Sequence, residues 1–146
     1  MAIDFKKYEQ FVDAVTSDSS KDFVALADRM GELDRQGACI ERLTTAGIGL
    51  AAESGEFLEI VKKMVFQGKP WNDDNREHLI IELGDVMWYV ANACIALGVD
   101  FDDVVKGNVK KLEKRYPGGS FSVEKSEVRA KGCLLYTSPS PRDNTT

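Results

Sequence analysis

Apolar side chains recur every three or four residues along most of the chain, the spacing that gathers them on one face of a helix. Glycine, proline and capping residues interrupt this pattern and mark where the helices should begin and end. The predicted helices run over Asp4–Val15, Ser20–Arg35, Ile40–Phe66, Asp73 or Asp74 to Gly98, and about Asp100 to Pro117.

Alternation of apolar and polar residues, the mark of a half-buried strand, is not convincing anywhere before residue 120. Phe121–Val128 (FSVEKSEV) is the one short candidate for extended structure. The fold class is therefore predicted to be all-α, a bundle of about four to five helices. Its centre would be an antiparallel hairpin of the third and fourth helices, because a short connection between two helices favours that arrangement.

Length and composition fit one compact domain, since the chain has 146 residues and 43% hydrophobic content. We predict a single domain over residues 1–121, followed by an extended or disordered tail over 122–146. From Cys133 onward the tail is rich in Pro, Ser and Thr and breaks from the helical pattern, so we interpret it as a read-through of non-native sequence. Cys39, Cys94 and Cys133 are far apart and odd in number, which disfavours a disulfide framework or a zinc site, and Cys94 is predicted to be core.

The net charge of the chain argues against nucleic acid polymers as partners. A net charge of −5 disfavours a binder of nucleic acid polymers, which needs a basic face to displace counterions. No apolar run approaches the roughly 20 residues of a membrane span, and the N-terminus lacks the pattern of a signal peptide. We therefore expect a cytoplasmic protein without a membrane partner.

Two pairs of acids stand on the apolar faces of the central helices. Glu53 and Glu56 are three residues apart, as are Glu82 and Asp85, so each pair lies in one sector of its helix. Local salt bridges do not neutralise them, because no Lys or Arg occurs between Arg42 and Lys62 or between Arg76 and Lys106.

The two pairs are also symmetric in the sequence. Glu56 and Glu82 are equally distant from Lys69, and so are Glu53 and Asp85, which puts all four at one level of an antiparallel hairpin. Clustered anions that are partly removed from water repel one another unless a cation compensates them. An all-oxygen cluster suits a hard ion, so the pattern predicts a Mg²⁺ site, with Mn²⁺ as the other candidate.

The four acids also have structural explanations that need no metal. An ExxE pair alone is commonplace on a solvated helix face, and basic side chains of the fifth predicted helix could neutralise the acids from a distance. Asn108, Lys111 and Arg115, however, share one helical face and offer an amide and two cations to an anionic ligand. Metal ions beside such groups are typical of phosphate chemistry, and the chain has no P-loop motif.

Three segments together resemble one family: GLAAESGEFLEIVKK, IIELGDVMWYVANACIALGV and NVKKLEKRYPGG. They are similar to the MazG-like all-α nucleotide pyrophosphohydrolases of the small phage and bacterial type. The likeness covers roughly Leu43–Phe121, which we take as the catalytic core. It implies Mg²⁺-dependent hydrolysis of a nucleoside triphosphate, often a deoxynucleotide, to the monophosphate and pyrophosphate, by a homodimer or homotetramer.

The resemblance also implies roles for individual residues. Glu53, Glu56, Glu82 and Asp85 would be catalytic metal ligands, one of them or a neighbour orienting the attacking water. Lys111 and Arg115 would hold phosphates with Asn108 nearby, and Tyr89 matches a position that contacts the sugar or lower nucleotide. Many members carry a further Glu where this chain has Ala52, so water activation rests on fewer carboxylates here.

Two further residues are candidates for substrate binding, each with a structural alternative. His78, one turn before Glu82, would touch a phosphate or support the metal ligands, or else be a surface or half-buried histidine without a role. Trp71 would stack on a base, or else anchor the turn.

Other functions stay open at this stage. One alternative is a related dUTPase-like or phosphoribosyl-ATP pyrophosphohydrolase. The other is a non-enzymatic helical binding or regulatory module in which the acids are structural. Independently of these, the fourth helix is apolar almost all round and needs neighbours on several sides, which predicts at least a homodimer.

Overall fold

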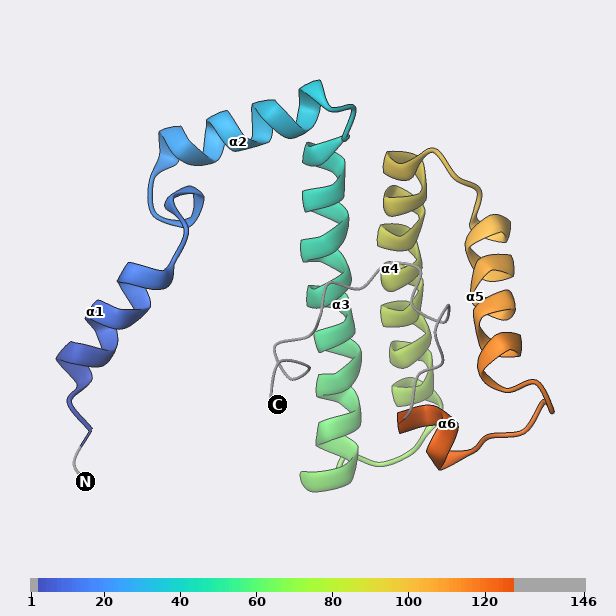
Figure 1. The fold of residues 1–146 in the computed structure, drawn as a ribbon. Coiled ribbons are helices and arrows are strands. Elements are labelled where there is room, and N and C mark those ends of the chain that lie inside the picture. The colour runs from blue at the N-terminus through green and yellow to red at the C-terminus, as the bar shows by residue number, and fades with distance from the viewer. Residues whose placement is uncertain (1–2, 128–146) are drawn as a thin grey trace. The chain divides into compact units, whose positions relative to one another are not determined.

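The structure, a computed structural model, describes residues 3–127. Every regular element within that range is helical, which confirms the all-α prediction. The elements are α1 (Phe5–Val15), the 3-10 helix η1 (Asp18–Ser20), α2 (Phe23–Arg35), α3 (Ile40–Phe66), α4 (Asp73–Leu97), α5 (Phe101–Arg115) and α6 (Val123–Glu127) (Figure 1). The predicted tail beyond residue 127, including Cys133, lies outside the described residues.

The chain divides into two compact units, and each is described by itself. The first ends at Gly98 and contains α1 to α4, with the acid pairs on α3 and α4. The second begins at Val99 and contains α5 and α6, with the predicted phosphate-binding residues on α5.

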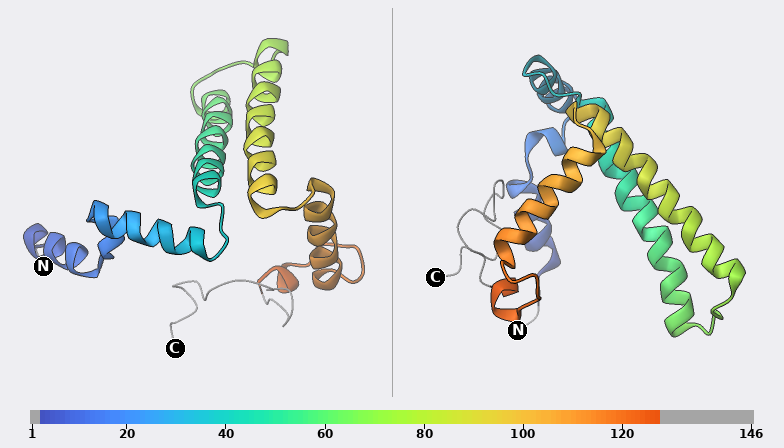
Figure 2. Two further views of the ribbon diagram at one scale, coloured as in Figure 1. Left: turned by 90° about the horizontal axis from the view of Figure 1, so that it is seen from above. Right: turned by 90° about the vertical axis from the view of Figure 1, so that its right-hand side faces the viewer.

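The central feature of the first unit is the predicted antiparallel hairpin of α3 and α4. The two helices lie side by side along most of their length in every view (Figures 1 and 2). Gly68, with φ of +70°, adopts the left-handed conformation between them, which glycine takes without steric cost. Asn72 caps α4 by accepting a hydrogen bond from the backbone N–H of Asn75 at 2.9 Å. The cap therefore stands one residue before Asp73 and two before Asp74, the two predicted positions.

Small side chains let the two helices approach closely. Ala46 and Gly49 of α3 are buried, and the ring of Tyr89 on α4 lies directly over the Cα of Gly49. A Cβ atom at Gly49 would stand 2.0 Å from Cε1 of that ring, so only glycine fits. Cys94 is buried at 8% exposure, which confirms it as core.

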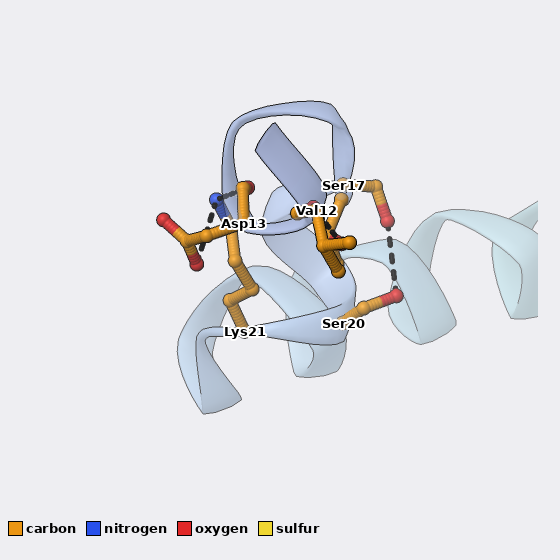
Figure 3. A network of polar contacts seen from close by, with 6 residues as sticks. Val12, Asp13, Ser17, Ser20 and Lys21 are labelled. Atoms are coloured by element: carbon orange, nitrogen blue, oxygen red, sulfur yellow. Dashed lines mark hydrogen bonds and ion pairs between the residues drawn. The ribbon is translucent and has the colours of Figure 1, made fainter. Parts of the chain in front are cut away.

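The connection between α1 and α2 is held by local polar contacts (Figure 3). The ammonium group of Lys21 donates to the backbone carbonyl of Asp13 at 2.8 Å, and the hydroxyls of Ser17 and Ser20 lie 3.1 Å apart. Asp22 then caps α2 by accepting from the N–H of Ala25. The predicted start of this helix at Ser20 falls in η1, three residues before α2 begins.

The expectation of extended structure over Phe121–Val128 is wrong for the residues described. Val123–Glu127 form α6, and the N–H of Ser126 donates to the carbonyl of Ser122 at 3.0 Å. Arg115, at the end of α5, donates to the carbonyl of Ser126. This contact between α5 and a helical turn is tertiary, and a short apolar–polar alternation does not reveal it.

Candidate metal centre

The hairpin brings together carboxylates that are about thirty residues apart in the chain. Glu53 of α3 and Glu82 and Asp85 of α4 each offer one oxygen, and these three oxygens lie within 4.8 Å of one another. The antiparallel packing is responsible, because it sets the middle of α3 against the middle of α4 (Figure 2). The sequence had placed these three acids at one level, and the geometry agrees.

Burial differs among the three acids. Glu82 is 6% exposed, Glu53 is half-buried, and Asp85 is exposed. An ionised carboxylate as buried as Glu82 needs a hydrogen-bond donor or a cation. His78, one turn earlier on α4, supplies one contact, with 3.0 Å between its Nε2 and Oε1 of Glu82.

The cluster is electrostatically strained as it stands. Burial raises the pKa of the Glu53 carboxyl above its usual value, and the negative charges of Glu56, Asp85 and Glu82 raise it further. Among the described side chains no Lys or Arg forms an ion pair with Glu53, Glu82 or Asp85. Neutralisation from a distance by basic side chains of the fifth predicted helix, which is α5 of the second unit, stays open.

The donor set fits a hard divalent ion. All three groups are carboxylates, the ligands that Mg²⁺ and Mn²⁺ prefer. Their oxygens lie within 4.8 Å of one another, so Glu53, Glu82 and Asp85 could hold one such ion between them.

Glu56 stands apart from this group. Its side chain is exposed, and it is not among the oxygens that lie within 4.8 Å of one another. It still acts on the cluster, because its charge raises the pKa of Glu53. Glu56 also lines a hollow of about 360 Å³, which it shares with Glu82.

The hollow lies toward the turn of the hairpin. Besides these two acids its lining includes Gly55, Glu59, Lys63 and His78, together with Lys69 from the turn itself. Sequence reasoning did not select Lys69 or Gly55 as functional. A signal for Lys69 was present, since the two acid pairs are symmetric about it.

The predicted nucleotide-contacting residues of the first unit have differing surroundings. Tyr89 is packed on Gly49, with its ring edge-to-face against Trp88 at 4.8 Å between centroids. Trp71 is 69% exposed in the turn, so it does not anchor the turn by burial. His78 is exposed and contacts Glu82, and its role in supporting the metal ligands stays a prediction.

The predicted phosphate-binding residues lie in the second unit. Asn108 and Lys111 are exposed on α5. Arg115 is half-buried, donates to the carbonyl of Ser126, and lies 5.6 Å from the ring centroid of Tyr116. Part of its hydrogen-bonding capacity is thus used within its own unit.

Comparison with known proteins identifies the central region. The family model for the MazG nucleotide pyrophosphohydrolase domain matches residues 42–120. The gene 37 protein of Mycobacterium phage L5 is 40% identical over 82 residues, which span 55% of this chain and 71% of the phage protein. No solved structure matches the chain. The matched region contains α4, α5 and all of α3 except its first two residues, and it leaves out α1 and α2.

Proposed function

Because the chain belongs to the MazG nucleotide pyrophosphohydrolase family, we propose that it hydrolyses nucleoside triphosphates, deoxynucleotides in particular, to the monophosphate and pyrophosphate. In this reaction the oxygen of a water molecule bonds to the α-phosphorus. The bond from that phosphorus to the bridging oxygen breaks, and pyrophosphate leaves with the bridging oxygen. The protons of the water pass to a carboxylate and to solvent.

One observation carries this assignment: three carboxylates from two helices converge within 4.8 Å, and no described Lys or Arg pairs with them. Glu53, Glu82 and Asp85 are proposed to hold Mg²⁺, or Mn²⁺ in its place. When bound, the ion would neutralise phosphate charge and polarise the phosphoryl oxygens.

Residues around the cluster have separate proposed roles. Glu56, expected in the same ligand set, is assigned to orient the attacking water, because its exposed carboxylate lies outside the converging group yet one turn from Glu53. His78 is assigned to hold Oε1 of Glu82, which leaves the second oxygen of that carboxylate for the ion.

Four further residues are proposed to contact the nucleotide, together with Asn108. Lys111 and Arg115 would bind phosphate oxygens, with Asn108 donating nearby, as the family resemblance implies. Trp71, which is largely exposed, would stack on the base. Tyr89 would face the sugar with the part of its ring that Gly49 and Trp88 do not cover.

A homodimer or homotetramer in the cytoplasm is proposed as the working form. Seven large apolar side chains of α4 are between 42% and 64% exposed: Ile80, Ile81, Leu83, Met87, Trp88, Ile95 and Leu97. By length and composition alone α4 could also cross a membrane, contrary to the sequence expectation, although one such helix is weak support for a span. Glu82 and Asp85 within it favour cover by a second copy, since carboxylates are costly in lipid. Sedimentation at the monomer mass of 16.2 kDa at all concentrations would contradict this.

Pyrophosphate release tests the activity directly. The substrates are dATP, dCTP, dGTP, dTTP, dUTP, the ribonucleotides and phosphoribosyl-ATP, each with Mg²⁺. A preference for dUTP or for phosphoribosyl-ATP would select one of the related enzymes instead. Glu82→Gln should abolish turnover, whereas Glu77→Gln, an exposed acid on the same helix, should retain it. No release from any of these substrates would favour a non-enzymatic module.

A further inference from the structure

The hollow beside the acidic cluster combines acids with cations in an ordered way. Its lining changes from the carboxylates of Glu56 and Glu82 to the ammonium groups of Lys63 and Lys69. Along α3, Lys63 lies about 10 Å beyond Glu56, at the usual rise of 1.5 Å per residue. The acidic part adjoins the metal centre, because Glu82 belongs to both.

The cationic part carries surplus positive charge. Glu59, which also lines the hollow, is shared by Lys62 and Lys63, the latter at 3.3 Å. One carboxylate thus faces two ammonium groups. Lys69 is half-buried and forms no ion pair with any described residue. A half-buried ammonium group without a carboxylate partner is well suited to bind an anion.

We propose that this hollow receives the pyrophosphate end of the substrate, and that Lys69 binds its terminal phosphate. The assignment rests on the proposed function and adds a specificity determinant to it. Lys69 would favour triphosphates over diphosphates, since a diphosphate bound with the same α-phosphate has no phosphate to offer at that end. The pyrophosphate product would occupy the same place before release.

Two features of the hollow support a polyphosphate occupant. Gly55 contributes no side chain, and a Cβ atom there would meet nothing within 4 Å, so the space is open. Glu56 and Glu82 would repel phosphate oxygens unless a divalent cation lies between them. Binding should therefore require the metal, as expected for a phosphate group held between an ion and a lysine.

Calorimetry with inorganic pyrophosphate, in the presence of Mg²⁺, tests the assignment without relying on turnover. Lys69→Met should weaken binding roughly tenfold, the usual effect of removing one charge-assisted hydrogen bond. Lys6→Met is the matched control, since it removes the same charge from an exposed position on α1, and it should bind as the wild type does. Chelating the metal should abolish binding in all three proteins.

A second variant fills the space instead of removing the charge. Gly55→Leu places a side chain where the hollow is open and raises helix propensity, so it should fold normally by circular dichroism. We expect it to weaken pyrophosphate binding at least as much as Lys69→Met does. In turnover assays the Lys69 variant should raise KM for the triphosphate and lower the preference for triphosphate over diphosphate.

The outcomes separate this assignment from the proposed activity. Unchanged pyrophosphate affinity in both variants, or no pyrophosphate binding by the wild type, would overturn it even if the enzyme hydrolyses nucleotides. Weakened pyrophosphate binding in both variants, with a wild type that hydrolyses no nucleotide, would keep the anion site and remove the proposed reaction.

Discussion

Replacing Gly49 with alanine is the most direct test of how α3 and α4 pack. Gly49 is buried in α3, and its added Cβ would lie 2.0, 2.2 and 2.3 Å from three ring carbons of Tyr89. Carbon atoms in ordinary contact are about 3.5–4.0 Å apart, so the ring or the helix must move by more than 1 Å. Because the obstructing atoms belong to the body of a rigid ring, a simple rotation of a flexible chain end does not relieve the clash.

Two opposing contributions decide the stability of this variant. Alanine in place of glycine favours a helix by about 1 kcal/mol. Overpacking costs about 1–3 kcal/mol, and the short distances at Gly49 put this case at the upper end. The net expectation is a loss of about 2 kcal/mol. Gly47→Ala is the matched control, since it is exposed on the same helix with nothing within 4 Å, and it should gain about 1 kcal/mol.

Urea unfolding followed by circular dichroism measures both free energies. Introducing Gly49→Ala into a Tyr89→Ala background removes the clash, so there the alanine should stabilise as it does at Gly47. The resulting coupling between positions 49 and 89 should be about 3 kcal/mol, the upper end for residues in contact. Equal stability of Gly49→Ala and Gly47→Ala would show that α3 and α4 do not pack as closely at Gly49 as described.

Three other measurements address charge, metal and capping. With metal chelated, the folded state binds the Glu53 proton more tightly than the unfolded chain does, because folding raises the pKa of this carboxyl. The stability of the wild type should therefore fall as pH rises from the usual carboxyl range through the raised pKa. Thermal melts of Glu53→Gln should lack this part of the loss. An equal pH slope in both proteins would refute the strained cluster. Mg²⁺ at ten times its Kd should stabilise the wild type by about 1.4 kcal/mol. Asp85→Asn should weaken that response in scanning fluorimetry, and an undiminished response would exclude Asp85 as a ligand. Asn72→Ala should lower the stability by about 1 kcal/mol, because it removes the hydrogen bond from the N–H of Asn75. Asn72→Ser should restore most of this stability. An alanine variant as stable as the wild type would show that the cap is not needed.

Local sequence patterns were sufficient for the helices. The three- and four-residue spacing and the stop at Gly68 and Pro70 predicted α3 and α4 to within one residue at most ends. These features act over a few neighbouring residues, so no tertiary contact is needed to read them. Where a boundary depended on a contact from elsewhere, as in the turn of α6 held by Arg115, the prediction failed.

Symmetry about the turn was sufficient for much of the acidic cluster. It predicted that Glu53 meets Glu82 and Asp85, as the structure shows. Separately, the family match confirms the expected resemblance to MazG-like proteins. The symmetry also placed Glu56 in the group, where the structure does not. Residues three apart on a helix differ by about 60° in direction and 4.5 Å along the axis, so the two members of a pair need not reach one point.

The sequence by itself determined the all-α class, the hairpin and the acids at its middle, because helix periodicity and turn residues act locally. Only the tertiary structure decided that Tyr89 lies over Gly49, that His78 contacts Glu82 while Glu56 stays outside the converging oxygens, and that Lys69 lines a hollow. The contacts across the hairpin depend on how far apart and at what rotation two helices pack. Side-chain volumes at the shared face set both quantities, and no spacing within one helix encodes them.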